Sequence, residues 1–406
     1  MTRVLISGAS IAGPALAFWL HRYGVESTIV ERAPALRLGG QNVDVRGAGR
    51  EVARRMGLED DIRAATTGEV GTRFVGRGGR TLAEFPAGTS DSGGATAELE
   101  ILRGDLARLL VDRTVEHTEY RYGDRITGLD DDGDAIGRAG VTVSFENAPD
   151  ERFDLVVAAD GIGSSTRRLV FGTEPEIRSL GLETSYATIP RTAADDDWWR
   201  WYSAAGGRSI TLRPDPHGTL RVALSQVIDR RLDRASTERR SIDEQRAHLR
   251  TVFGDAGWEA QRVLRGLDEA DDLYYEQIGQ VHAPRWSSGR VALVGDAAYC
   301  ASPVSGMGTS LSLAGAYVLA GELAAHVDPR DGFAGYERVM RPYVMQAQAL
   351  PPGVPRVANP VSRLGVAAFG LAVKVAATPV IGRTMGRFFT PPADAIALPE
   401  YSHLER

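Results

Sequence analysis

The start of the chain has two short strand-like segments, the first of them an apolar run, separated by a helical pattern. Residues 4–7 form an apolar run that ends at Gly8, and residues 25–30 form the next predicted strand, which ends before Glu31. Near-continuous apolar runs of this length are typical of buried parallel strands. Between them, residues 13–21 place apolar side chains at helical spacing, and Gly24 suits the end of a helix. The pattern predicts a strand–helix–strand unit of a parallel sheet.

The same pattern returns further along the chain. Residues 153–159 and 290–294 are again buried-strand runs, whereas residues 103–115 and 309–326 have helical patterns. Residues 141–145 alternate apolar and polar side chains, which we interpret as an edge strand. Together these segments predict an α/β fold with a Rossmann-like domain.

Residues 71–100 and 176–280 have a different pattern and interrupt this domain. Within them, the alternating segments 209–212 and 220–224 flank a turn at residues 214–218, which is a hairpin signal. We expect an inserted β-sheet domain from these residues. The Rossmann-like domain would then comprise residues 1–70, 101–175 and 281–345.

The last segment, residues 346–406, is expected to be helical and is rich in Pro, Ala and Val. Its apolar stretch at residues 364–389 is interrupted by Pro379 and by charged residues such as Lys374. No clean run therefore reaches the roughly 18 apolar residues of a membrane span. We expect a pair of helices packed on the body of the protein, with association with a membrane surface as the alternative.

Composition narrows the possible classes of protein. The chain has 406 residues, of which 43% are apolar and 25% charged, as in a soluble protein with two joined domains. A net charge of −6 argues mildly against a general nucleic-acid binder. With Cys300 as its single cysteine, the chain cannot form an internal disulfide or a multi-cysteine metal site. We expect a cytoplasmic protein, a monomer or weak homo-oligomer, without signal peptide, bound metal or membrane span.

The first chemical motif lies where a dinucleotide-binding turn should lie, after a strand and before a helix. Gly8 would form the tight turn, and Gly13 would allow close packing of the helix on the strand. Backbone N–H groups and the helix dipole would then face a pyrophosphate. Ser10 replaces the usual middle glycine, and its hydroxyl can donate to a phosphate. A purely structural glycine-rich turn is the alternative for this motif, Gly8-Ala9-Ser10-Ile11-Ala12-Gly13.

Glu31 follows the second strand and supports the cofactor interpretation. A carboxylate at this position can accept hydrogen bonds from both ribose hydroxyls and would repel a 2′-phosphate. The position therefore suits the adenosine of FAD or NAD better than that of NADP. The alternative is a surface glutamate, and Arg32 could lie against the adenine or be solvated.

Two further junctions combine a strand end, a carboxylate and glycines. Asp160 follows one buried strand, and Gly295 with Asp296 follows another, before the helix that starts near Gly308. Such carboxylates can bind hydroxyl groups, and a helix N-terminus favours negative charge. Each junction alone is only a strand–turn–helix connection, but three in this order are specific.

Five motifs together resemble one known family, the aromatic-hydroxylase class of flavin monooxygenases, whose best-known members are the para-hydroxybenzoate hydroxylases. Within it, the chain is most similar to the tetracycline-inactivating and polyketide-tailoring enzymes, over residues 1–345. The motifs are GASIAG at 8–13, ERAP at 31–34, LRGDL at 102–106, AADGIGS at 158–164, and GDAAY at 295–299 with Pro303, Gly306 and Gly308.

The resemblance implies an enzyme in which one dinucleotide-binding fold holds FAD, and NAD(P)H is a co-substrate without a fold of its own. It implies that O₂ is used to hydroxylate an aromatic or polycyclic phenol or enol, through a flavin C4a-hydroperoxide. The inserted sheet would bind this small-molecule substrate. Two other functions stay open: a reductase or dehydrogenase without oxygen transfer, and a non-enzymatic FAD-binding redox sensor.

The resemblance also implies cofactor contacts for five charged residues. Glu31 would bind the adenosine ribose, and Asp44 and Arg103 would lie near the flavin. Asp160 would belong to the motif linked to both FAD and NAD(P)H. Asp296 would bind the ribityl chain.

Further positions are implied around the flavin ring. Pro303, Gly306 and Gly308 would shape the pocket beside the isoalloxazine, and Arg37 is a candidate for the NAD(P)H phosphates. Tyr299 stands where many relatives have histidine, which leaves the role of this position open.

Aromatic residues gather in the inserted segment, where Trp199 and Trp201 could stack on a flat polycyclic substrate. Packing in a core or hinge is an equally good interpretation. No base for the substrate hydroxyl can be chosen. His217 is expected in a solvated turn, and the sequence indicates no role for His282. Cys300 is expected to be a buried, unreactive thiol.

Overall fold

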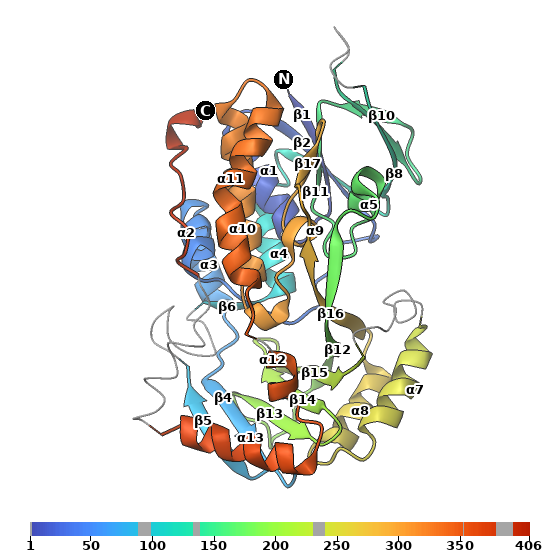
Figure 1. Cartoon of the computed structure of the whole chain (residues 1–406), viewed down its shortest axis with the longest axis vertical. Coiled ribbons are helices and arrows are strands. Elements are labelled where there is room, and N and C mark those ends of the chain that lie inside the picture. Colours follow the sequence, from blue (N-terminus) through green and yellow to red (C-terminus); the bar gives the residue numbers. More distant parts are fainter. Residues whose placement is uncertain (1, 88–98, 133–138, 230–239, 352, 379–392) are drawn as a thin grey trace.

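The computed structural model describes residues 2–87, 99–132, 139–229, 240–351, 353–378 and 393–406. They form a part built on a six-stranded sheet and a part built on a seven-stranded sheet, one above the other in Figure 1. A three-stranded sheet and a two-stranded sheet complete the architecture. The predicted α/β fold with an additional β-sheet domain is confirmed.

The six-stranded sheet has the order β17-β18-β11-β1-β2-β7. Its strands are parallel except for β17 at one edge. The predicted strand–helix–strand unit at the start of the chain is confirmed, with α1 (Ala12–Arg22) as its helix. The strands are β1 (Arg3–Ser7), β2 (Glu26–Glu31), β7 (Thr118–Tyr122), β11 (Leu155–Ala158), β17 (Ser287–Ser288) and β18 (Val291–Leu293).

Alternate residues of β1 enter two different cores, which explains why the whole strand is apolar. Val4 and Ile6 pack with α1 and with α10 (Gly308–Ala325), whereas Leu5 packs with the three-stranded sheet. The strands β3 (Asn42–Asp44) and β6 (Glu100–Leu102) form the two-stranded sheet. The other helices of this part are α2 (Gly47–Arg55), α3 (Glu59–Ala64), α4 (Arg103–Asp112), α5 (Ser165–Phe171), α9 (Asp296–Tyr299) and α11 (Pro329–Gln348), with the 3-10 turn η1 (Pro303–Ser305).

Residues 141–145 form a strand, β9 (Val141–Phe145), but their predicted position at a sheet edge is wrong. β9 is the middle strand of the three-stranded sheet, between β8 (Ile126–Asp131) and β10 (Glu151–Phe153). Its apolar side chains are buried in the core shared with Leu5. An alternating pattern therefore reports one buried face of a strand and says nothing about its lateral position.

The seven-stranded sheet has the order β16-β12-β15-β14-β13-β4-β5. The hairpin predicted around residues 214–218 is confirmed, because β14 and β15 pair antiparallel. Helices α7 (Ile242–Phe253) and α8 (Ala260–Glu269) cover one face of the sheet. The strands are β4 (Gly71–Val75), β5 (Thr81–Pro86), β12 (Glu176–Pro190), β13 (Trp198–Ala204), β14 (Arg208–Pro214), β15 (Thr219–Val227) and β16 (Tyr274–His282).

Parts of the predicted domain plan lie outside the described residues. They are 88–98 and 230–239 in the inserted segments, 133–138 in the Rossmann-like domain, and 352 and 379–392 in the C-terminal segment. The exact domain boundaries, and the pairing of two C-terminal helices, stay predictions.

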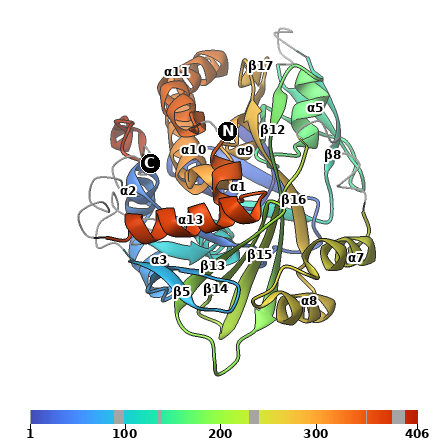
Figure 2. The same cartoon turned by 60° about the horizontal axis from the view of Figure 1, so that its bottom comes forward.

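The described C-terminal residues contact both parts of the molecule. After α12 (Val354–Ala358), helix α13 (Arg363–Ala376) lies across the face of the seven-stranded sheet opposite α7 and α8 (Figure 2). Residues 393–406 then lie along the helices of the first part, mostly extended, with one 3-10 turn, η2 (Ser402–Leu404). None of the described helices combines the length and apolarity that a membrane crossing requires.

Candidate functional site

Four of the predicted motifs meet at one edge of the six-stranded sheet. Because β18, β11, β1 and β2 are neighbouring parallel strands, their carboxyl ends lie at the same edge. Gly295, Asp160 and Gly8 follow three of these ends, and Glu31 is the last residue of β2. Open parallel sheets bind ligands in the crevice at this edge.

The turns at this edge leave no room for side chains at three glycines. Gly8 has φ +111°, and a Cβ there would lie 2.5 Å from the backbone oxygen of Ala159. A Cβ on Gly13 would lie 2.0 Å from the backbone oxygen of Gly8, and one on Gly295 would lie 2.9 Å from the Cβ of Ala12. The predicted roles of Gly8 in a tight turn and of Gly13 in close helix packing are therefore confirmed.

Glu31 is held at the end of β2 by two backbone groups. Its Oε2 accepts a hydrogen bond from the N–H of Ala9 at 3.0 Å, and its Oε1 accepts one from the N–H of Ala33 at 2.9 Å. These bonds orient the carboxylate and leave each oxygen a further lone pair, which suits a ribose diol. Arg32 and Arg37 are exposed, and their contacts with adenine and NAD(P)H stay predictions.

Arg103 brings a positive charge to the turn after β1. Its guanidinium donates to the Oγ of Ser10 at 3.3 Å and to the backbone oxygen of Gly39 at 3.1 Å. Ser10 can thus accept from Arg103 and use its own proton for a phosphate. The N-cap residue of α1, Ile11, provides no side-chain cap, so the first N–H groups of α1 are free to bind an anion.

Asp296 lies at the start of α9, directly after β18. Burial raises the pKa of its carboxyl, whereas the neighbouring Cys300 thiol and the Arg103 guanidinium act in the opposite direction. Burial also raises the pKa of the Cys300 thiol well above its usual range, which agrees with a buried, unreactive cysteine. A partly buried carboxylate beside Arg103 suits the hydroxyls of a polyol, such as the predicted ribityl chain.

Asp160 caps the start of α5. Its Oδ2 accepts from the N–H of Thr166 at 3.2 Å and from its hydroxyl at 3.1 Å. A direct contact of Asp160 with FAD or NAD(P)H stays a prediction. The sequence analysis missed Arg167, which is buried and donates to the backbone oxygens of Ile162 at 2.7 Å and Ala297 at 2.8 Å. Arg167 thereby ties the turn after β11 to the turn after β18.

The segment before α10 combines a strained residue with open space. Ser302 has φ +76°, which is unfavourable for a residue other than glycine, and its hydroxyl is buried without a hydrogen-bond partner among the described residues. A Cβ on Gly308, the first residue of α10, would have nothing within 4 Å. These observations fit a ligand lying against the N-terminus of α10. The predicted isoalloxazine contacts of Pro303, Gly306 and Gly308 are consistent with this arrangement.

Asp44 ends β3 and pairs with an arginine that the sequence analysis missed. The Arg46 guanidinium lies 2.9 Å from Oδ2 of Asp44, and only 3% of the Arg46 side chain is exposed. The backbone oxygen of Arg46 accepts from the hydroxyl of Ser310, near the start of α10, at 2.9 Å. Asp44 therefore lies close to the segment around Gly308, as expected for a residue near the flavin.

Trp199 and Trp201 lie on the sheet face that α7 and α8 do not cover. The guanidinium of Arg213 lies 4.2 Å from the ring centre of Trp199, and both indole N–H groups are buried without hydrogen-bond partners within the described ranges. Arg213 also forms an ion pair with Glu100 of β6, three residues before Arg103. The aromatic face is thus joined to the strand that carries Arg103, whereas its contact with substrate stays a prediction.

Two residues left open by the sequence have defined partners. His217 is not merely solvated as expected, because the turn between β14 and β15 brings its Nε2 to 3.1 Å from Oδ2 of Asp105 on α4. Tyr299 is buried, and its hydroxyl accepts from Tyr336 at 2.9 Å, so it belongs to the core of the larger part.

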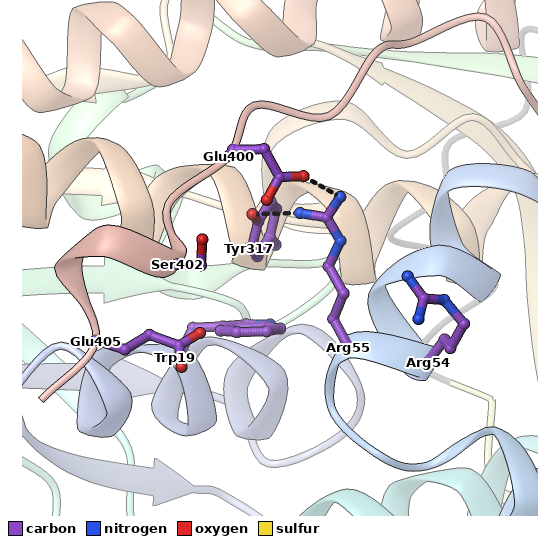
Figure 3. Close-up of a pocket in the computed structure, with 7 residues that line it drawn as sticks. All are labelled: Trp19, Arg54, Arg55, Tyr317, Glu400, Ser402 and Glu405. Atoms are coloured by element: carbon purple, nitrogen blue, oxygen red, sulfur yellow. Dashed lines mark hydrogen bonds and ion pairs between the residues drawn. The ribbon is translucent and has the colours of Figure 1, made fainter.

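A cavity of about 260 Å³ lies elsewhere, between α1, α2, α10 and the last residues of the chain (Figure 3). Arg55 crosses it and donates to Tyr317 at 2.6 Å and to Glu400 at 2.5 Å. None of its lining residues belongs to the predicted site. We therefore assign it to the packing of the C-terminal segment.

The geometry at the sheet edge fits FAD. The turn after β1 with Ser10 and Arg103 suits a pyrophosphate, Glu31 suits the ribose, and the open space beside Gly308 lies where the resemblance implies the isoalloxazine. In the described ranges, no group of three or more His, Cys, Asp or Glu side chains is arranged to hold a metal ion. The arrangement can bind and orient a redox cofactor.

Comparisons with known proteins agree with this geometry. Residues 1–349 match the family described as FAD binding domain. The chain is 37% identical over 423 residues to the flavin-dependent monooxygenase eupH of Phoma sp, covering 98% of this chain and 97% of eupH. The crystal structure of tetracycline destructase Tet(51) superposes with a TM-score of 0.80 at 30% identity, covering 99% of this chain and 100% of Tet(51).

A third likeness concerns the fold alone. Klebsiella pneumoniae HpxO, complexed with FAD and uric acid, has a TM-score of 0.72 at 22% identity, covering 96% of this chain and 97% of that one. The family match and the identity to eupH carry the assignment. The chain belongs to the FAD binding domain family and is an enzyme of the flavin-dependent monooxygenase class.

Proposed function

We propose that this enzyme takes electrons from NAD(P)H and uses O₂ to hydroxylate a polycyclic phenol or enol, working in the cytoplasm. The observation that carries the proposal is the link between the cofactor edge and the aromatic face. Arg213 lies over Trp199 and pairs with Glu100, on the strand that leads into Arg103. A substrate on the aromatic face would therefore lie close to the cofactor.

The residues of the chain would bind and orient the reactants. Bound FAD would supply electron transfer from NAD(P)H and activation of O₂. Trp199 and Trp201 offer flat apolar surfaces for a polycyclic ring system, with indole N–H groups for its oxygen atoms. Both tryptophans are half-buried, and a bound ring system that displaced the remaining water would favour oxygen transfer over loss of the activated oxygen. The name of Tet(51), a tetracycline destructase, supports a polycyclic substrate, and the name of eupH supports a monooxygenase.

Oxygen transfer is tested with the purified, FAD-loaded protein. NADH and NADPH consumption would be followed with tetracyclines, hydroxyanthraquinones and other polycyclic phenols under ¹⁸O₂, with mass detection of products. A product heavier by one ¹⁸O atom would support hydroxylation and name the substrate class. NAD(P)H oxidation without labelled product across the panel would instead favour the reductase.

The cofactor site is tested by Glu31→Gln. Loss of the charged acceptor should weaken FAD binding at least about tenfold, since hydrogen bonds to charged groups contribute about 1.5–3 kcal/mol. The matched control is Glu26→Gln, an exposed glutamate at the other end of β2. Equal FAD affinities for both variants, measured by flavin fluorescence, would contradict the assigned site.

A further inference from the structure

A group of buried charges lies between the cofactor edge and the aromatic face, and we call it the acid cluster. It consists of Asp44, Glu69, Glu100, Arg46 and Arg213. Only 3% of the Glu69 side chain and 5% of the Glu100 side chain are exposed. In the β3–β6 sheet, Asp44 stands directly opposite Glu100. The cluster therefore joins the strand ends near the predicted flavin to β14 of the seven-stranded sheet.

The acid cluster contains more carboxylates than guanidinium groups. Arg46 forms an ion pair with Asp44, whereas Arg213 forms ion pairs with both Glu69 and Glu100. If all three acids were ionised, the described members would carry one uncompensated negative charge. An uncompensated buried charge is unfavourable, so the cluster tends to hold one proton.

The two glutamates differ in how their oxygens are used. Oε1 of Glu100 accepts from Asn42 at 2.5 Å and from Thr67 at 3.1 Å, and its Oε2 accepts from Arg213. Oε2 of Glu69 accepts from Nε of Arg213 at 2.5 Å. Oε1 of Glu69 is buried and has no hydrogen-bond partner among the described residues. Oε1 of Glu69 is therefore the carboxylate oxygen of this pair that is free to bind a proton without sharing an existing hydrogen bond, whereas both oxygens of Glu100 already accept one or more.

Further polar atoms without partners lie on the neighbouring strands. Trp199 of β13 stands opposite Thr72 of β4, the strand that begins shortly after Glu69 in the sequence. The indole N–H of Trp199 and the hydroxyl of Thr72 are both buried without hydrogen-bond partners in the described part of the chain. Buried polar groups are normally satisfied, so this set suits the polar atoms of a bound ligand.

We propose that Glu69 is the base that accepts the proton of the substrate hydroxyl, an assignment that rests on the proposed function. The O–H bond of the phenol or enol breaks, its electron pair stays on the substrate oxygen, and a new O–H bond forms on Oε1 of Glu69. The electron-rich anion left behind is the form that an electrophilic oxygen attacks. Glu100 is a positioning residue, whose negative charge keeps the proton affinity of Glu69 high.

The titration behaviour of the cluster supports this role. Burial raises the pKa of Glu69 to about 7, with Glu100 and Asp44 acting in the same direction and Arg213 in the opposite one. Burial likewise raises the pKa of Glu100. A base functions best when its pKa lies near the working pH.

The test measures proton uptake when the FAD-loaded protein binds alizarin, a hydroxyanthraquinone present as its coloured anion at pH 8. Adding this anion to the ionised cluster should drive one proton onto Glu69. Titration calorimetry in two buffers of different ionisation enthalpy should therefore give an uptake near one proton per bound dye. The Glu69→Gln variant should bind the dye with an uptake near zero.

Two further variants separate proton binding from a structural role. Glu84 is an exposed carboxylate on β5 that pairs with Arg73 of β4. The Glu84→Gln variant should behave as the unchanged protein. Glu100→Gln should move the pH of half-maximal uptake downward, because Glu69 then faces Arg213 alone.

The possible failures are distinguishable. Dye binding without uptake by the unchanged protein, or equal uptake by the Glu69→Gln variant, would overturn the assignment of Glu69 and leave the proposed function intact. Failure of the FAD-loaded protein to bind alizarin or any other polycyclic phenol of the panel would overturn the proposed substrate class, and the role of Glu69 with it.

Discussion

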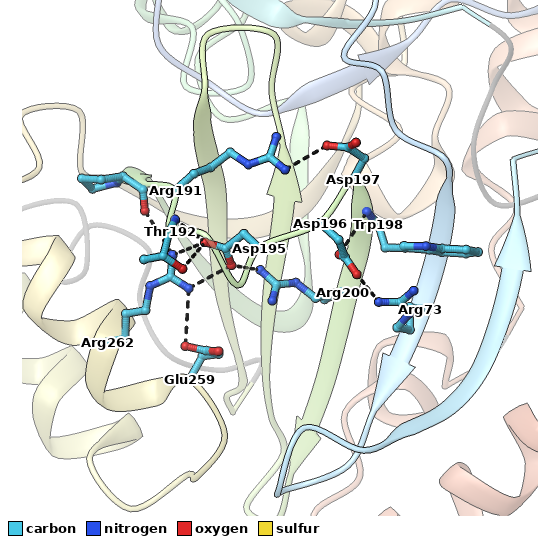
Figure 4. A network of polar contacts seen from close by, with 11 residues as sticks. Arg73, Arg191, Thr192, Asp195, Asp196, Asp197, Trp198, Arg200, Glu259 and Arg262 are labelled. Atoms are coloured by element: carbon cyan, nitrogen blue, oxygen red, sulfur yellow. Dashed lines mark hydrogen bonds and ion pairs between the residues drawn. The ribbon is translucent and has the colours of Figure 1, made fainter.

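The seven-stranded sheet carries buried acid–arginine clusters on its two faces, and they have opposite stoichiometry. On the face covered by α8, one carboxylate, Asp195, is bound by two arginines, Arg200 and Arg262 (Figure 4). On the other face, one arginine, Arg213, is shared by Glu69 and Glu100. The same residue types are present in both clusters, so the difference lies in the balance of charge.

The balance of charge sets the direction of the pKa shifts. Burial acts to raise the pKa of Asp195, but hydrogen bonds from Arg262, Thr192 and Arg200 outweigh it and hold the pKa well below the usual range. Burial of Glu69 is not outweighed, because its arginine is shared with a second carboxylate. A carboxylate that has two arginine partners stabilises the fold. A carboxylate that shares one arginine with a second carboxylate can exchange a proton near neutral pH.

Replacing Asp195 with asparagine should have the largest effect on stability. It would leave the buried Arg200 without its counter-charge and leave Arg262 with Glu259 alone, and breaking a buried pair costs about 3–5 kcal/mol. Urea unfolding at pH 7 would measure this loss. A loss below about 1 kcal/mol would show that these ion pairs stabilise the fold no more than exposed pairs do.

Replacing Arg213 with methionine should destabilise the protein by about 3 kcal/mol at pH 8, because two buried carboxylates would lose their common partner. The loss should be smaller at pH 5.5, where the acids can be protonated. Unfolding in urea at both pH values checks this, and an equal loss at both would contradict the charge balance.

Replacing Glu69 with glutamine should remove a pH dependence of stability. The folded-state pKa of Glu69 lies above its unfolded value, so the folded state holds more protons and loses stability as pH rises from about 4.5 to about 7. Relative to the Glu69→Gln variant, the unchanged protein should lose about 2 kcal/mol between pH 5 and pH 8. Parallel unfolding curves would exclude this shift. The sign is opposite for Asp195, whose stabilising contribution is lost as pH falls.

Replacing Asp197 with asparagine should have the smallest effect. Its carboxylate is 58% exposed and lies 2.9 Å from Arg191, and exposed ion pairs contribute about 0–1 kcal/mol. The change in unfolding free energy should stay below about 0.5 kcal/mol. A larger change would mean that solvent exposure does not explain why the buried ion pairs contribute more to stability than this exposed one.

The cofactor edge could be predicted from the sequence because each part is local. Gly8 directly follows one strand and Glu31 ends the next, so both lie at the sheet edge whatever the rest of the chain does. Parallel pairing then brings these ends together with Asp160 and Gly295. The general fold and the hairpin followed from periodicity in the same way.

The acid cluster could not be predicted, because Arg213 is joined to its two glutamates only by long-range contacts. Glu69 and Glu100 lie 144 and 113 residues from Arg213. In the sequence each is a single charged residue beside a strand, and most such residues are solvated. Arg46 and Arg167 also have local partners, but their positions in the site depend on the distant residues Ser310 and Ala297. One sequence signal could have indicated the cluster. The alternation of β14 places Arg213 on the same face of the sheet as Trp199, where a charged residue needs a partner.

The last residues of the chain have a consequence for how the protein folds. Arg406 donates its backbone N–H to the carbonyl of Arg22 at 2.9 Å, and Arg22 pairs with Glu405, 383 residues away. Tyr401 is buried against Tyr317 of α10. The packing surface around α1, which is synthesised long before these residues, is therefore completed only when they have been added. Such distant contacts slow folding, so we expect nascent chains to expose the apolar surface of α1 and α10 and to depend on chaperones during translation.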